Sequence, residues 1–153
     1  MFAEAYEFQY RNHKSGEMLG EPWEKEHLYT FKDKHHRKYI VVVEEYGYSF
    51  FAIKFHLRKD RNNPKKYELL TGYHDPARVI RTCVDIMIDL YQKNPYSSFG
   101  FKGSNSIGEA NINTKRFRIY RQVMEFFFSL ERFFHFYDTK NSAYLLINKD
   151  NPL

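Results

Sequence analysis

Two runs of β-branched and aromatic residues in the first half of the chain predict a β-hairpin. They lie within KYIVVVEEYGYSFFAIKFHLRK, residues 38–59, on either side of a break at Gly47. Valine, isoleucine and aromatic side chains favour strands, and a glycine between two such runs is typical of a hairpin turn. Shorter apolar runs predict strands at residues 5–10 and 28–31, and the polar run KDKHHRK predicts a turn. YELLTGY, residues 67–73, can return as the third strand of an antiparallel meander.

The segment HDPARVIRTCVDIMIDLYQKNP has the clearest helical period in the chain. At 100° per residue its apolar side chains fall on one side, and Arg81, Asp85 and Asp89 fall on the other. Asp75 can cap the helix, and the Asn-Pro pair that follows Lys93 ends it. Because Arg81 and Asp85 are four residues apart, we expect an ion pair on a solvated face rather than an acid–base pair of aspartates.

The second half of the chain predicts a strand at residues 97–102, a long helix at about 113–133, and two strands around the polar turn in HFYDTKNSAYLLINK. Residues 1–26 form a polar, acidic N-terminal strand and connection, and no flexible linker divides the chain. The prediction is a single α+β domain covering residues 1–153. Two amphipathic helices pack on one face of a mostly antiparallel sheet of about five to six strands, which places every apolar face in one core.

Composition favours a cytoplasmic location for this domain. Of 153 residues, 19% are aromatic and one is a cysteine, so no intrachain disulfide can form and a reducing compartment is expected. Cys83 has apolar neighbours on its helix and is expected to be a buried, inert thiol. No apolar run approaches the ~20 residues that cross a bilayer, and the first residues lack a signal layout, so no membrane partner is expected.

The distribution of charge suggests a polyanionic partner. The net charge is +5, yet residues 1–26 hold six acidic residues against three basic ones. Residues 54–66 hold six basic residues against Asp60, and residues 113–132 hold five against two acidic ones. Such clusters fit a nucleic acid or another polyanion, and ordinary surface charge is the alternative that the sequence leaves open.

The stretch FGFKGSNSIGEANINTKRFRIYR, residues 99–121, is the sequence's candidate phosphate site. Arg116 falls within the apolar sector at the start of the second helix, where an unpaired charge is unfavourable and the helix dipole favours an anion. The alternative is that Arg116 ties down the loop through Glu109 or a backbone carbonyl. Arg118 and Arg121 point to solvent, where Glu125 can pair with Arg121. The candidate phosphate-binding residues are Lys102, Gly103, Ser104, Arg116, Arg118 and Arg121.

The motif KGSN followed by RFRIYR resembles the signature of a bacterial family of small α+β proteins, a domain of unknown function. In that signature a strand ends in Gly-Ser, and a helix opens with Arg-x-Arg-Leu-Tyr-Arg after a short loop. The matching positions here are Gly103, Ser104, Arg116, Arg118, Tyr120 and Arg121, with Ile119 in place of Leu. The loop SNSIGEANINT is longer than in the family. The resemblance spans roughly residues 38–148 in element order and implies the fold and the place of a site, but no activity.

The absence of several well-known motifs disfavours the common nucleotide-binding enzymes and hydrolases. The seven histidines are scattered without the spacing of a zinc site, and no phosphate-binding or dinucleotide fingerprint or nucleophile elbow is present. No metal and no cofactor are therefore expected. The aromatic run YGYSFFAIKFHLRK is expected to be core, with Tyr46, Tyr48 and His56 as exceptions, although such a run can also form a platform for nucleobases.

The leading hypothesis is binding of a phosphate-bearing ligand, RNA or DNA, with the turn at 58–66 as an outlying basic contact. A sharper version is a metal-independent ribonuclease of toxin–antitoxin type, with Arg116, Tyr120 and His74 as candidate catalytic residues. The alternative is a protein-interaction module or defence component that binds an acidic partner protein. A small-molecule phosphate or nucleotide binder is a third class, and aromatic residues at a sheet edge leave a homodimer open.

Overall fold

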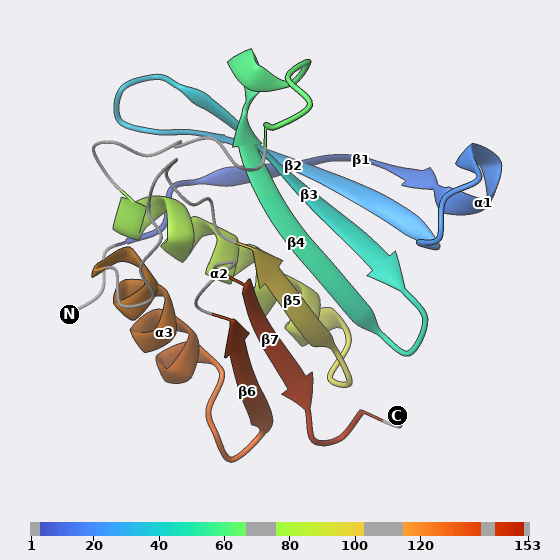
Figure 1. The fold of residues 1–153 in the computed structure, drawn as a ribbon, viewed down its shortest axis with the longest axis vertical. Coiled ribbons are helices and arrows are strands. Elements are labelled where there is room, and N and C mark those ends of the chain that lie inside the picture. The colour runs from blue at the N-terminus through green and yellow to red at the C-terminus, as the bar shows by residue number, and fades with distance from the viewer. Residues whose placement is uncertain (1–3, 67–75, 103–114, 139–142, 152–153) are drawn as a thin grey trace.

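In a computed structural model that describes residues 4–66, 76–102, 115–138 and 143–151, seven strands form one sheet and two long helices pack on it (Figure 1). This confirms the α+β class with two helices, and the strand count is slightly higher than predicted. The strands are β1 (Phe8–Ser15), β2 (Lys25–Lys32), β3 (Lys38–Tyr46), β4 (Phe50–Leu57), β5 (Ser98–Lys102), β6 (Phe133–Asp138) and β7 (Ala143–Asn148). The helices are α1 (Gly16–Leu19), α2 (Pro76–Lys93) and α3 (Lys115–Phe127), with a 3-10 turn η1 (Arg58–Asp60).

The strand order across the sheet is β1-β2-β3-β4-β5-β7-β6. β1 to β4 form an antiparallel meander, β5 pairs with β4 in parallel, and β7 pairs antiparallel with both β5 and β6. A parallel pair needs a crossover connection, and α2 lies in the connection from β4 to β5. Strands β1 and β6 are therefore the two edges of the sheet.

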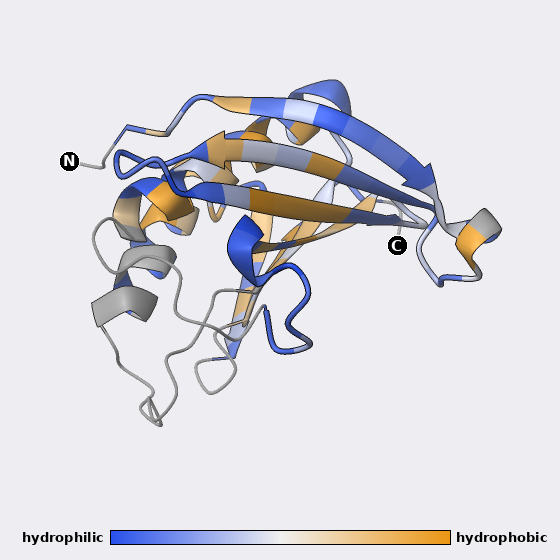
Figure 2. Ribbon diagram, turned by 90° about the horizontal axis from the view of Figure 1, so that it is seen from above, coloured by the Kyte–Doolittle hydropathy of each residue, from blue (hydrophilic) through white to orange (hydrophobic). Residues whose placement is uncertain are grey.

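One face of the sheet is buried under α2 and α3, and we call it the helix face. Residues that pair across neighbouring strands share a face, so Val43, Ile53, Phe101 and Tyr144 form one buried row. They belong to the same core cluster as Met87 of α2 and residues of α3. Alternate residues point the other way, to what we call the open face of the sheet. In Figure 2 the middle of the inner strand β3 is hydrophobic, whereas the edge strand β1 is mostly hydrophilic.

Helix α2 has the predicted amphipathic arrangement. Cys83 is completely buried, and this burial raises the pKa of its thiol well above the usual range. On the opposite side, Arg81 forms an ion pair with Asp85, and Lys93 pairs with Asp89 at 3.0 Å. The Lys93–Asp89 pair lies at the surface, whereas Arg81 is partly buried, with its guanidinium 4.0 Å from the ring centroid of Phe127, and is less solvated than predicted. Among the described helices none is long and apolar enough to span a bilayer.

Two boundaries differ from the predictions. The first strand runs to Ser15, where the sequence predicted a connection, because an edge strand needs few buried side chains and carries polar ones. The helix predicted to reach residue 133 ends at Phe127, and Phe133 already belongs to β6. The dense aromatic run between them fits a helix and a strand equally well, so its period does not mark the boundary. The predicted strand at 67–73 and the predicted cap Asp75 lie outside the described residues.

The core side chains of the central strands dominate stability, and an exposed aromatic on the same sheet provides a matched control. Phe101 is 2% exposed and its ring stacks near Phe55, whereas Phe136 is 55% exposed on the open face. We expect Phe101→Ala to lower the free energy of unfolding by about 3–5 kcal/mol, because it leaves a cavity. Phe136→Ala should change it by only about 0.5 kcal/mol. Urea denaturation of both variants checks this, and similar losses would contradict the assignment of the two faces.

Candidate functional site

A basic groove crosses the open face of β1, β2 and β3 and is bounded by η1. Its volume is about 900 Å³, and its lining includes Arg11, Lys32, Lys38 and Arg58 with Glu7 as its acidic member. All four basic residues are exposed. A smaller hollow of about 320 Å³ shares Lys38 and Arg58 with the basic groove and is lined further by Arg37, Leu57, Lys59 and Arg61. Together they form one continuous positively charged surface.

The register of the β2–β3 hairpin places two lysines of this groove directly opposite each other. Lys32 is the cross-strand partner of Lys38. Arg58 directly follows Leu57, the last residue of β4, which pairs with Tyr39 next to Lys38. Like charges at directly opposed positions of an antiparallel pair are unfavourable for the sheet itself. The fold therefore keeps these cations together at a cost in stability, which a bound anion would relieve.

Arg11 reaches the basic groove because of an irregularity in β1. Tyr10 pairs with Tyr29 and Asn12 with Leu28, so the ladder skips Arg11 as the extra residue of a β-bulge. The Nε of Arg11 donates a hydrogen bond of 2.6 Å to the Oγ1 of Thr30, which faces the open side. Thr30 takes one of the five guanidinium N–H donors, and the terminal N–H groups can bind an anion.

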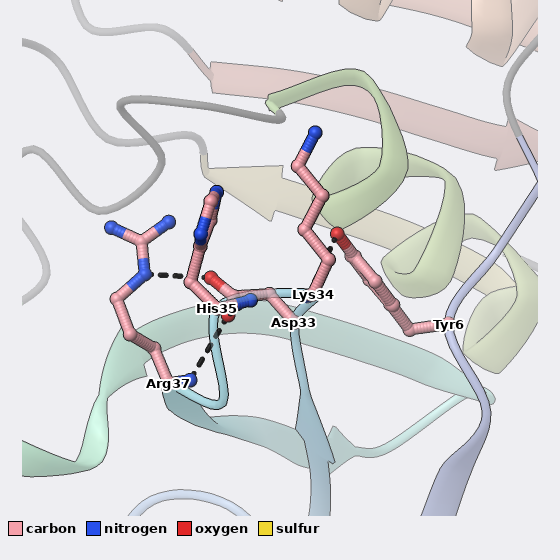
Figure 3. A network of polar contacts seen from close by, with 5 residues as sticks. All are labelled: Tyr6, Asp33, Lys34, His35 and Arg37. Carbon is pink, nitrogen blue, oxygen red and sulfur yellow. Dashed lines mark hydrogen bonds and ion pairs between the residues drawn. The ribbon is translucent and has the colours of Figure 1, made fainter.

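The turn between β2 and β3 is held by a buried aspartate (Figure 3). Asp33 accepts hydrogen bonds from the backbone N–H of His35 at 2.8 Å, and from the backbone N–H and Nε of Arg37 at 3.0 and 2.7 Å. Burial by itself raises the pKa of Asp33, but these bonds and the Arg37 charge hold that pKa below its ordinary value. The backbone N–H of Lys34 donates to the hydroxyl of Tyr6 at 3.3 Å. This network fixes the turn that presents Lys32 and Lys38.

His56 lies on the open face next to the basic groove, opposite Ile40. The sequence analysis expected it to lie outside the core, but the structure buries it. Its Nδ1 contacts the backbone carbonyl of Leu57 at 2.9 Å, so this nitrogen is the donor. Burial lowers the pKa of His56, and the nearby charge of Lys66 lowers it further. His56 is therefore neutral near pH 7, and the charge of the groove comes from arginine and lysine.

The other half of the open face carries an apolar groove over β4, β5, β7 and β6, with a volume of about 500 Å³. Its floor is shallow at Ala52 and Gly100, which are cross-strand partners, and Phe136 and Leu145 line its side. The ring of Phe50 lies 3.0 Å from the position that a Cβ on Gly100 would occupy, so a larger residue there would displace this ring. At the edge nearer the basic groove, Lys54 pairs with Glu44 at 3.1 Å.

Two of the sequence-predicted phosphate residues, Arg118 and Arg121, are described on α3, and neither lines the basic groove. Arg118 is exposed on α3, and Arg121 pairs with Glu125 at 3.1 Å, as predicted. The guanidinium of Arg121 also lies 4.7 Å from the ring centroid of Tyr137, a residue in the helix-face row of Tyr144. The Glu125 hydrogen bond raises the pKa of Arg121, so this side chain is already engaged.

The remaining predicted residues are described in part or not at all. Arg116 and Tyr120 belong to the first two turns of α3, and Lys102 is the last residue of β5, opposite Ala143. Their side chains lie outside the described part of the structure. The predicted residues Gly103, Ser104 and His74 lie outside the described ranges altogether.

The sequence contained a signal for part of the basic groove. Lys32 and Lys38 are the first and last residues of the turn sequence KDKHHRK, and a hairpin whose register is symmetric about this turn pairs them. Arg11 carried no such signal, because a bulge moves one side chain without a mark in the composition. Within the described ranges, no three His, Cys, Asp or Glu side chains come together as metal ligands.

Comparisons with protein-family models, with curated proteins and with solved structures give no significant match to this chain. The resemblance of the KGSN and RFRIYR motifs to a bacterial family stays a prediction. The candidate site rests on its own geometry.

Acid should destabilise the protein through the buried His56 and the part-buried His135. Burial lowers the pKa of His56 and of His135, whereas an unfolded histidine titrates near about 6.5. The unfolded chain therefore binds more protons below that pH, and the stability present above it is lost as the pH falls toward the native pKa values. We expect His56→Gln to show a smaller loss of unfolding free energy between pH 7.5 and 5 than the wild type, by urea denaturation. An unchanged loss would contradict a neutral buried His56.

Proposed function

We propose that the protein binds the sugar–phosphate backbone of RNA or DNA in the basic groove. The observation that carries the proposal is the opposed pair Lys32 and Lys38, with Arg11 and Arg58 on the same open surface. Backbone phosphates meet such a row of cations with release of condensed counterions, which supplies much of the affinity of nucleic-acid-binding proteins. A groove rather than a single pocket suits a polymer better than a small phosphate ligand.

The rest of the open face favours a single strand over a duplex. Phe134 and Phe136 are exposed there, next to the apolar groove floored by Ala52 and Gly100. Open sheet faces with exposed aromatic side chains stack unpaired bases, whereas bases in a duplex are not available for stacking. Phosphates in the basic groove and bases over the apolar groove would use the two halves of one surface.

A finer proposal is that this binding serves a metal-independent ribonuclease, such as the toxin of a bacterial toxin–antitoxin pair acting in the cytoplasm. A ribonuclease of this kind must hold single-stranded RNA along its backbone, and a groove that contacts phosphates supports this.

The second candidate function is a protein-interaction module or defence component with an acidic partner. The edge strand β6 favours it, because its sequence FFHFYD has exposed Phe134, Phe136 and Tyr137 and one charged residue. Unpaired edge strands with few charges accept further strands, from a partner protein or from a second copy of the chain. A partner of this class would form a saturable protein complex, and RNA binding would be weak.

The location of the phosphate site can be tested by salt-dependent binding. We expect labelled single-stranded RNA to bind in fluorescence anisotropy more tightly at 50 than at 200 mM salt. The double variant Lys32→Ala/Lys38→Ala should weaken binding and reduce the slope of log affinity against log salt by about 2, one unit for each lost phosphate contact. Single-stranded DNA and duplex DNA serve as parallel ligands.

The controls separate the basic groove from the start of α3. Arg116→Ala and Arg118→Ala test the site predicted from the sequence, and Lys149→Ala removes one charge outside both grooves. Folding of each variant is checked by circular dichroism. A loss of binding in the α3 variants alone would move the site to α3. Absence of RNA and DNA binding at 50 mM salt would contradict the function and favour an acidic protein partner.

A further inference from the structure

A second polar cluster lies on the helix face of β1, β2 and β3, on the opposite side of β1 from Arg11. The hydroxyl of Tyr10 contacts Nδ1 of His27 at 3.0 Å, and Nε2 of His27 contacts Oε1 of Glu45 at 2.9 Å. The ring of His13 lies 6.1 Å from that of His27, centroid to centroid. A phenol, two imidazoles and a carboxylate thus meet at one edge of the sheet.

The bulge in β1 creates this cluster. In a regular strand Tyr10 and His13 would point to opposite faces, because they are three residues apart. The extra residue Arg11 shifts the alternation of the following residues by one position. Tyr10 therefore pairs with Tyr29 and His13 pairs with His27, both on the helix face. This one β-bulge therefore places Arg11 in the basic groove and places Tyr10 and His13 next to His27.

The partners of His27 fix the direction of the hydrogen bonds. An ionised Glu45 can only accept, so His27 in its neutral form would carry its proton on Nε2 and donate it to Glu45. Nδ1 of His27 is then an acceptor, and the hydroxyl of Tyr10 donates to it. A base that is oriented by a carboxylate and bonded to a hydroxyl is the arrangement that activates hydroxyl groups in enzymes.

The cluster is accessible at one end and shielded at the other. The side chains of His27 and Glu45 are 15% and 28% exposed, whereas Tyr10 is 48% exposed. Two cations stand near it: Lys25 precedes His27 by two residues on the same face, and the charge of Lys93 on α2 acts on Tyr10. Desolvation raises the pKa of Tyr10, with Glu45 adding to the rise and Lys93 opposing it, so the phenol keeps its proton until a base takes it.

We propose that Tyr10, His13, His27 and Glu45 form a proton-transfer site that cleaves RNA by transesterification without a metal ion. The proposal rests on the proposed function for its substrate class. Its single-stranded substrate would lie in the basic groove on the open face and pass over the outer edge of β1, which has no neighbouring strand in the described sheet. Arg11 and Tyr10, adjacent in sequence, would then contact successive parts of one strand.

The reaction needs no further reactant. The 2′-hydroxyl of a ribose gives its proton to the oxygen of Tyr10 as the Tyr10 proton moves to Nδ1 of His27, and the 2′-oxygen attacks the adjacent phosphorus. The P–O5′ bond breaks, and protonated His13 gives its proton to the leaving O5′. The products are a 2′,3′-cyclic phosphate and a 5′-hydroxyl end. Glu45 acts through His27 as a positioning residue, and exchange with water returns both histidines to their starting states.

The test uses the full-length protein and a fluorogenic oligodeoxynucleotide that contains one ribonucleotide, in the presence of EDTA. We expect cleavage at the ribonucleotide to a cyclic phosphate end and no cleavage of the all-deoxy version. Tyr10→Phe, His27→Gln and His13→Gln should each lower the rate at least about 100-fold, as loss of a general acid or base does. Glu45→Gln should lower kcat at unchanged KM, and Glu45→Asp should recover part of it.

Matched controls show whether a variant loses cleavage because it loses proton transfer or because it loses folding or RNA binding. Tyr96→Phe removes an exposed phenol hydroxyl from the turn after α2 and should leave the rate unchanged. Each variant is checked for folding by circular dichroism and for RNA binding by anisotropy. Variants of the cluster that keep binding but lose cleavage support the proposal.

The outcomes distinguish this proposal from the binding function. Wild-type protein that binds RNA without cleaving it, or cleavage that survives His27→Gln, would overturn the proton-transfer site and leave the groove intact. Cleavage that depends on His27 but not on Lys32 and Lys38 would support the site and overturn the binding function. A covalent adduct between Tyr10 and the all-deoxy strand would overturn transesterification, because Tyr10 would then be the nucleophile.

Discussion

The burial of one sheet face under α2 and α3 is the constraint on which the other features depend. Once Val43, Ile53 and Phe101 face the helices, the residues between them must face outward. The open face then carries the side chains that the core does not need, and these divide into a basic half and an apolar half. The same alternation buries Tyr144 in the core, and the apolar side of α2 that packs on this face buries Cys83.

The bulge at Arg11 adds the second constraint, because it gives the edge strand β1 a role on both faces. Arg11 bonds to Thr30 on the open side, while Tyr10 and His13 gather around His27 on the helix side. An edge strand has an unpaired side and neighbours on one flank alone, so a ligand can contact both of its faces. Bulges occur next to active sites for this reason, since they redirect a side chain without a change of fold.

The sequence predicted elements wherever a local period was strong. The hairpin at residues 38–59 and the helix α2 follow from such periods, and the Arg81–Asp85 and Arg121–Glu125 pairs follow from helical spacing. The extent of β1 could not be predicted, because a polar edge strand lacks alternation. The end of α3 could not be predicted either, because consecutive phenylalanines fit the helical and the strand period equally well. For the site, the hairpin register implied the opposed Lys32 and Lys38.

The sequence by itself determined the α+β class, the two amphipathic helices and the acidic and basic segments, because period and composition are properties of neighbouring residues. Only the tertiary structure decided which strands are edges, that Arg11 joins Lys38 in one groove, and that Tyr10, His27 and Glu45 meet across three strands. These features depend on pairing between segments far apart in the chain and on a bulge in one of them. Long-range pairing is selected by the burial of the whole core, which no local pattern records.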